Sequence, residues 1–367
     1  MTKFIYRLFS LALVTILGFS ITFNVAASSQ MTTAVYFETC DVPEDVIECF
    51  ANNIDGLAKS VAITYNVNAD KIAFGGFYPI RGTENMYYIP VYFESECLCL
   101  VTYRLQDDIV SLNYSSAASD CLNNLPNGVY YFENVNNCNF IVGAEAVFEI
   151  ETMYSLEEND VEWPTYNPED NDSVMNIRGG LQYIGIGRQT RDVSTNSLDV
   201  PLYANGGNPG YGYCWLSCCA SIMEYYGYAP SSLSGIHAYK HSDHALDYCV
   251  GGSIEDARDT ICYYSGKTGM TQNGRISAGT VQSQINAGKP VYSVWSHYND
   301  SGIRDAGHAM VITGYTYVDN TRSFTYKIMD PNCSNYVYIY SNSSDTQVTY
   351  SISGDTYIWD KTMYNFY

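Results

Sequence analysis

A cysteine, a histidine and an aspartate in this 367-residue chain have the surroundings of a nucleophilic hydrolase site. Cys214 follows a loop rich in glycine and proline, Gly207 to Tyr213, and opens a segment with the apolar spacing of an amphipathic helix. A helix start offers free backbone N–H groups and a positive partial charge, which favour a thiolate over a thiol. The sequence therefore predicts Cys214 as the nucleophile.

His308 has the surroundings of the base that such a thiol needs. An unperturbed cysteine, with a pKa of ~8.5, is only slightly ionised at neutral pH, so a neighbouring imidazolium is required. Of the five histidines, His308 directly follows Gly307 and begins the apolar run Ala309 to Tyr315. A rigid strand end holds an imidazole in place, and the small residue before it leaves room for substrate. The alternative is that His308 is an ordinary strand residue without a catalytic role.

The third group should accept a hydrogen bond from the far nitrogen of the imidazole and so fix its tautomer and orientation. Asp330 comes directly after the predicted strand Phe324 to Met329, which adjoins the histidine strand. Asp-Pro pairs also commonly start turns, so Asn332 and Asn335 remain alternatives for this role.

Twelve cysteines permit disulfides in an exported protein, and their pairing cannot be derived from the sequence. Cys214 could therefore be one half of a disulfide. Cys218 is a rival nucleophile, although it lies one turn inside the helix, where the dipole and the access are poorer. The cluster His241-Ser242-Asp243-His244 suggests a metal site, but without an HExxH motif the spacing is weak, and a solvated loop, no metal and no cofactor are expected.

The catalytic half, residues 199–367, predicts helices followed by strands. The helices are Cys214 to Tyr226, the segment from an N-cap at Ser253 to Gly266, and Ser277 to Ala287. The strands are Val291 to Ser296, His308 to Tyr315, Phe324 to Met329, Tyr336 to Tyr340 and Val348 to Trp359. This order is typical of an α+β fold with the nucleophile on the helical half and the base on the sheet half.

Three further segments precede the catalytic half. Residues 1–27 combine basic residues, an apolar run and a small-residue cleavage site, which predicts a secretory signal peptide and no stable membrane anchor. Residues 28–154 predict a helix at Glu44 to Leu57 and strands within Tyr87 to Leu105 and Ala146 to Met153, and they contain no histidine. Residues 155–198 begin with an acidic, proline-containing stretch and predict an exposed linker that serves as the activation segment, where a protease can cut. A net charge of −21 argues against nucleic-acid binding.

The segments Asn208 to Trp215, Gly307 to Tyr315 and Ile328 to Pro331 resemble those of secreted bacterial papain-like cysteine peptidases of the staphopain and streptopain type. The resemblance implies a two-lobed catalytic domain, with a helical lobe and an antiparallel β lobe, preceded by an α+β propeptide domain. It implies Cys214 as nucleophile and His308 as base and acid. Asp330 takes the place where this family usually has asparagine. Asn208 takes the place where the family commonly has a glutamine that donates to the oxyanion hole.

These expectations combine into a secreted cysteine endopeptidase that is made as a zymogen. Its partners would be protein or peptide substrates and its own propeptide, acting as an intramolecular inhibitor. One alternative keeps the fold and is a transglutaminase-like Cys-His-Asp acyltransferase. Another alternative is a secreted binding protein whose activity has lapsed. Its support is that Asn208 and Asp330 depart from the residues usual in the family, and that Asn208 could simply shape its turn.

Overall fold

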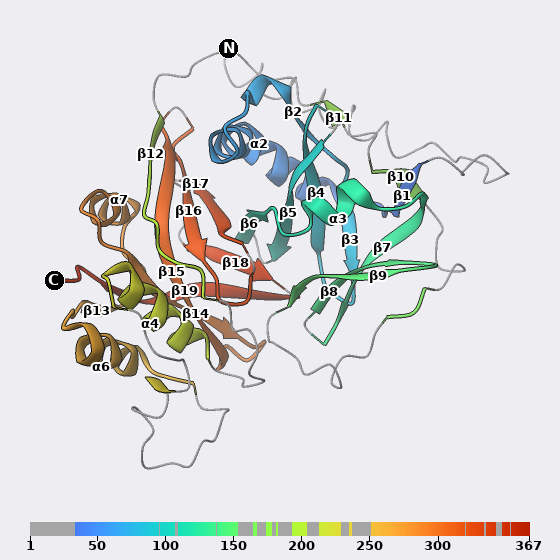
Figure 1. Ribbon diagram of the computed structural model, residues 1–367. Coiled ribbons are helices and arrows are strands. Elements are labelled where there is room, and N and C mark those ends of the chain that lie inside the picture. Colours follow the sequence, from blue (N-terminus) through green and yellow to red (C-terminus); the bar gives the residue numbers. More distant parts are fainter. Residues whose placement is uncertain are drawn as a thin grey trace.

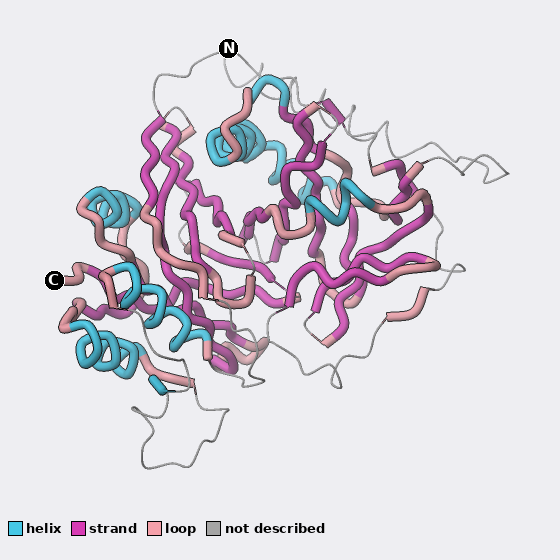
Figure 2. Tube along the Cα trace, viewed as in Figure 1, coloured by secondary structure: helices cyan, strands magenta, loops and turns pink. Residues whose placement is uncertain are grey.

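The computed structural model describes residues 34–94, 96–106, 109–136, 138–152, 164–166, 174–177, 181–182, 193–203, 213–228, 235–236, 251–319, 321–333, 335–342, 347–352 and 354–367. Strands dominate this part of the chain and a few helices accompany them (Figures 1 and 2), which confirms the expected α+β class. The described residues between 34 and 182 are termed the N-terminal region below, and those between 193 and 367 the C-terminal region.

The helices have physical reasons for their limits. They are α2 (Glu44–Thr64), the short α3 (Ser119–Asn124), α4 (Cys214–Tyr225), α6 (Ile254–Ser265) and α7 (Ala278–Asn286). In α6, Ser253 and Asp256 form a capping box, and Gly266 ends the helix at a φ of 68°. Ser277 caps α7 through the backbone N–H of Thr280. The helices predicted after residue 199 are confirmed to within a residue or two, whereas α2 continues well beyond Leu57.

One long sheet runs through both regions. Its strands in the N-terminal region are β2 (Ile72–Phe74), β4 (Met86–Phe93), β5 (Glu96–Gln106), β6 (Ile109–Ser115) and β11 (Leu181–Gln182). In the C-terminal region they are β12 (Val193–Ser197), β13 (Met270–Asn273), β14 (Val291–Tyr298), β15 (Arg304–Val318), β16 (Ser323–Met329), β17 (Val337–Asn342), β18 (Thr349–Ile352) and β19 (Asp355–Tyr364). The pairing order is β11–β2–β4–β5–β6–β17–β16–β15–β14–β19–β13, with β12 added to β15 and β18 to β19.

A further set of strands lies in the N-terminal region and is joined to the long sheet by one of its members, Tyr78–Arg81, which also pairs with β4. The set comprises β1 (Val35–Glu38), β3 (Tyr78–Arg81), β7 (Gly128–Val135), β8 (Cys138–Gly143), β9 (Val147–Thr152) and β10 (Val174–Asn176). The strands β10, β11 and β12 fall within residues 155–198, where the sequence predicted only a linker. The two-lobed papain arrangement and the propeptide role of residues 28–154 stay predictions.

One connection between the two regions is the antiparallel pairing of β6 with β17, which sets Tyr338 opposite Tyr114 and Tyr340 opposite Leu112. The rings of Tyr114 and Tyr338 stack at 5.1 Å between centroids. Figure 1 shows the helices α4, α6 and α7 on one side of the C-terminal strands and α2 on the other. The sheet is therefore covered by helices from both regions.

The predicted strand Val348 to Trp359 is wrong in one respect, because the chain turns back within it. The residues form two antiparallel strands, β18 and β19, which pair Ile352 with Asp355. Gly354 has a φ of 92°, a conformation that suits glycine and permits the tight turn. The alternation of Val348, Tyr350 and Ile352 stops before Gly354-Asp355, a turn signal that the prediction of one continuous strand overlooked.

Helix α2 packs closely on β16 and β17. Ser60 Oγ donates to Thr325 Oγ1 at 2.7 Å inside this contact. At Gly56, the Cβ of a larger residue would meet the hydroxyl oxygen of Tyr340 and lie 3.0 Å from Ser323 Oγ. The absence of a side chain at this position allows the helix to approach the sheet.

We expect Gly56→Ala to lower the free energy of unfolding by about 1–3 kcal/mol, because the clash outweighs the gain in helix propensity. Gly279→Ala is the matched control, since Gly279 is exposed on α7 and its Cβ would approach nothing closer than Ser277 Oγ at 4.0 Å. That substitution should raise the free energy of unfolding by about 0.5 kcal/mol. Urea unfolding measures both changes, and equal effects would contradict the close approach of α2.

Candidate active site

Helix α4 places Cys214 at the edge of the core. The helix begins at Cys214, and its N-cap residue Tyr213 makes no side-chain capping bond. Leu216, Cys219 and Ile222 are completely buried, and they fix the helix against the C-terminal core. The thiol of Cys214 therefore lies at the positive end of a firmly packed helix, beside N–H groups of its first turn.

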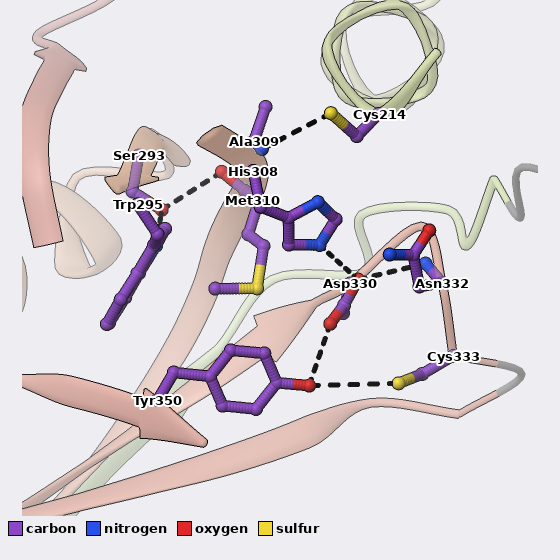
Figure 3. A network of polar contacts seen from close by, with 10 residues as sticks. All are labelled: Cys214, Ser293, Trp295, His308, Ala309, Met310, Asp330, Asn332, Cys333 and Tyr350. Carbon is purple, nitrogen blue, oxygen red and sulfur yellow. Dashed lines mark hydrogen bonds and ion pairs between the residues drawn. The ribbon is translucent and has the colours of Figure 1, made fainter. Parts of the chain in front are cut away.

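Strand β15 places His308 beside that thiol. His308 lies opposite Trp295 of β14 in the register, and only 3% of its surface is exposed. The next residue, Ala309, donates its backbone N–H to Cys214 Sγ at 3.5 Å. The imidazole faces the thiol of Cys214, with Nδ1 on the Cys214 side of the ring in Figure 3, and its proximity lowers the pKa of the thiol.

Asp330 holds the other ring nitrogen. It follows β16 directly and is completely buried, with Oδ1 2.7 Å from His308 Nε2. The same oxygen accepts the backbone N–H of Asn332 at 2.9 Å, and Oδ2 accepts the hydroxyl of Tyr350 at 2.8 Å (Figure 3). Because a carboxylate accepts hydrogen bonds only, Nε2 carries a proton and Nδ1 is the nitrogen that exchanges a proton with Cys214.

The electrostatics of the site favour a thiolate. Burial raises the pKa of the Cys214 thiol, but the hydrogen bond and charge of His308 and the N–H of Ala309 lower it more, so the net shift is downward. Burial lowers the pKa of His308, whereas the charge and hydrogen bond of Asp330 and the contact with Cys214 raise it, with a net result of about 10. The arrangement can therefore hold a thiolate–imidazolium pair at neutral pH.

The carboxylate of Asp330 stays charged despite its burial. Burial raises its pKa, but the charge and hydrogen bond of His308, followed by the bonds from Asn332 and Tyr350, lower it below the ordinary value. A buried carboxylate with several donors can keep its charge because each donor stabilises the ionised form. Asp330 can then orient the imidazole and stabilise its cation.

The structure brings three of the four predicted site residues together: Cys214, His308 and Asp330. Asn208, predicted as an oxyanion donor, lies outside the described residues. Asn332 contributes its backbone N–H to Asp330 rather than a side chain to His308, and Asn335 is exposed. Asp330 is thus the group that meets the imidazole.

The rival nucleophile fares worse than Cys214. Cys218 is completely buried, and burial together with the neighbouring charge of Cys214 raises its pKa well above the ordinary value. A thiol in this state is a poor nucleophile. Cys214 itself carries a free thiol, and Cys249 lies outside the described residues.

Two groups at the site were not predicted from the sequence. Tyr350 of β18 bonds Asp330, and its hydroxyl is 3.9 Å from Cys333 Sγ. Tyr357 of β19 lies with its ring centroid 6.4 Å from that of His308. The chain has 36 tyrosines, and nothing in the sequence distinguishes these two.

Among the described residues, no group of three or more His, Cys, Asp and Glu is arranged to hold a metal ion. The histidines at 241 and 244, considered for that role, lie outside the described residues, as does the predicted signal peptide 1–27. No helix in the described part of the chain is long and apolar enough to cross a membrane.

Residues 197–358 match the model of the Peptidase_C39 like family. This stretch includes Cys214, His308 and Asp330, so the match supports a cysteine peptidase and hence a hydrolase. No curated protein matches the chain.

Two solved structures show weak likeness. A putative C39-like peptidase from Bacillus anthracis has 13% identity and a TM-score of 0.28, and the match covers 41% of this chain and 100% of that protein. UfSP from C. elegans has 14% identity and a TM-score of 0.30, and the match covers 48% of this chain and 35% of UfSP. Support for a cysteine peptidase among these comparisons therefore comes from the family match.

The pH dependence of Cys214 alkylation tests the electrostatics. We expect the rate with iodoacetamide to rise along a thiolate titration whose midpoint lies below that of an ordinary cysteine, because His308 lowers the pKa of Cys214. His308→Ala should move this midpoint upward. Peptide mapping by mass spectrometry follows Cys214 alone, and Cys262, exposed on α6, serves as an internal reference that should not respond. An unchanged midpoint in the variant would contradict the ion pair.

Proposed function

We propose that this chain is a cysteine endopeptidase in which Cys214 is the nucleophile, His308 the general base and acid, and Asp330 the residue that orients the imidazole. The observation that carries the proposal is the direct sequence of contacts from the thiol through His308 to the buried carboxylate, at the start of a helix. The family match over residues 197–358 supports the same reaction class.

The geometry suits acyl transfer. Cys214 Sγ attacks the peptide carbonyl carbon, and the amine leaves with the proton from His308 Nδ1, which yields a thioester. Water then loses a proton to Nδ1 and attacks the thioester, so the acid product leaves and the thiol is restored. The backbone N–H of Cys214 at the helix start is suited to stabilise the oxyanion, and Asn208 is proposed as a second donor.

Secretion and zymogen maturation are the finer parts of the proposal. They derive from the sequence of residues 1–27 and of the acidic segment in 155–198, and from the resemblance to staphopain and streptopain. In this scheme the signal peptide is removed, and a peptide bond within residues 155–198 is cleaved, so that the two regions are no longer one continuous chain.

The protein from Ser28 onward, incubated under reducing conditions, tests the activity. Wild type should cleave itself within residues 155–198 and hydrolyse casein, whereas Cys214→Ala should stay whole and inert, because it lacks the nucleophile. Intact mass and casein hydrolysis measure the two reactions. Amine incorporation without cleavage would favour the acyltransferase, and a thiol at Cys214 inert to an epoxysuccinyl probe would favour a lapsed enzyme.

Substitutions at Asp330 test the third role. Asp330→Ala should lower kcat/KM on the order of 10²-fold or more, because the imidazole loses its orientation. Asp330→Asn keeps an acceptor for Nε2–H and should retain more activity. Its alkaline limb should move to lower pH, because the pKa of His308, about 10, depends on the charge of Asp330. Kinetics from pH 5 to 11 measure both, and identical profiles for Asp330→Asn and wild type would contradict the role of the charge.

A further inference from the structure

The hairpin of β18 and β19 lies between the N-terminal region and the candidate active site. Strand β18 lies against β6 and β5 of the N-terminal region and pairs with β19. Thr349 donates its hydroxyl to the backbone carbonyl of Val110 at 3.3 Å, while the next residue, Tyr350, donates to Asp330. Because neighbouring side chains of a strand point to opposite faces, β18 presents one face to the N-terminal region and the other to the site.

Two N-terminal side chains hold this hairpin. Asn113 of β6 accepts the backbone N–H of Ser351 at 3.3 Å, and both residues are buried. Arg104 of β5 donates through Nη1 to the carbonyl of Gly354 at 2.8 Å and to Thr356 Oγ1 at 3.0 Å. Asn113 contacts the backbone of Ser351, the residue after Tyr350, and Arg104 contacts the hairpin at its turn. The two side chains therefore fix the backbone of the hairpin directly.

The opposite face of the hairpin packs around the catalytic histidine and aspartate. Tyr350 is only 1% exposed, and its ring lies 6.2 Å from that of Trp295 between centroids. Trp359 of β19 stacks on Trp295 at 5.8 Å. Trp295 in turn lies opposite His308 in the sheet. A shift of the hairpin would therefore displace the Tyr350 hydroxyl from Asp330 Oδ2 and change the packing beside His308.

We infer that the N-terminal region is a lasting part of the active enzyme, in which Asn113 and Arg104 are positioning residues that act on Asp330 through the hairpin and Tyr350. The inference rests on the proposed function for its effect on turnover. Since β6 is hydrogen-bonded to β17 in one sheet, a cut within residues 155–198 leaves the N-terminal region attached. An inhibitor that must leave would make the opposite prediction for activity.

The test substitutes the positioning residues singly, as Asn113→Ala and Arg104→Ala. Each should lower kcat by a factor of about 3 to 10 with KM within about twofold, because Asp330 is misplaced and substrate contacts are kept. Each should also raise the midpoint of Cys214 alkylation, because a weaker Asp330–His308 contact stabilises less imidazolium. Arg104→Lys keeps a donor for Gly354 O and should restore most of both values.

Asn53→Ala is the matched control. Asn53 also bridges the two regions, since its Oδ1 accepts from Asn342 Nδ2 at 3.0 Å, but that bond lies at the end of β17, away from the hairpin. It should leave kcat and the alkylation midpoint unchanged. Circular dichroism verifies that each variant is folded, and Arg104, half-buried, provides a readable variant if Asn113→Ala does not fold.

Unchanged kcat and an unchanged alkylation midpoint in folded Arg104→Ala would overturn the inference. A rise in activity when the contact between the N-terminal region and the hairpin is weakened would also overturn it, because it would show that the N-terminal region is an inhibitor. The alkylation midpoint needs no peptide substrate. If wild type cleaves no peptide and the midpoint still shifts in the two variants but not in Asn53→Ala, the positioning role stands and the peptidase proposal fails.

Discussion

The buried carboxylate of Asp330 is the interaction on which the site depends. A charge without water contact costs several kcal/mol unless donors and a counter-charge compensate it. Here His308, the N–H of Asn332 and the hydroxyl of Tyr350 share the two oxygens. The compensation links three strands and fixes the proton on Nε2. It therefore determines both the tautomer of His308 and the stability of the imidazolium that faces Cys214.

The long sheet turns this local requirement into a property of the whole fold. His308 and Asp330 come from β15 and the end of β16, while Tyr350 reaches the carboxylate from β18. Strand β18 lies against β6, and β6 continues the sheet by pairing with β17. The position of the tyrosine thus depends on both regions of the chain. If the N-terminal region only covered the active site from outside, the position of Tyr350 would not depend on it.

Much of the site could be predicted because each reacting residue has a local signal. Cys214 opens a helix after a glycine-rich loop, and the helix appears at that residue. His308 and Asp330 lie on or directly after strands whose apolar patterns are strong. The choice of Asp330 over Asn332 needed the structure. The side chains of residues close together in a turn point in different directions, and the sequence pattern does not show which of them faces the imidazole.

Long-range pairing accounts for what the sequence did not reveal. The chain reverses at Gly354 within the segment predicted as one strand, and the contact of Tyr350 with Asp330 depends on how that hairpin folds back. The pairing of β6 with β17 joins segments far apart in the chain, and no local propensity encodes it. The strands β10 to β12 are short and lie within a polar segment, so their partners rather than their composition define them.

The most direct measurement is the trapping of an acyl-enzyme. A peptide ester mixed with the reduced protein and quenched in acid should leave its acyl group as a thioester on Cys214, with release of the alcohol. Mass spectrometry should find the adduct on the peptide that contains Cys214 in wild type and nowhere in Cys214→Ala. An adduct on another cysteine alone, or an equal adduct in both proteins, would contradict nucleophilic catalysis by Cys214.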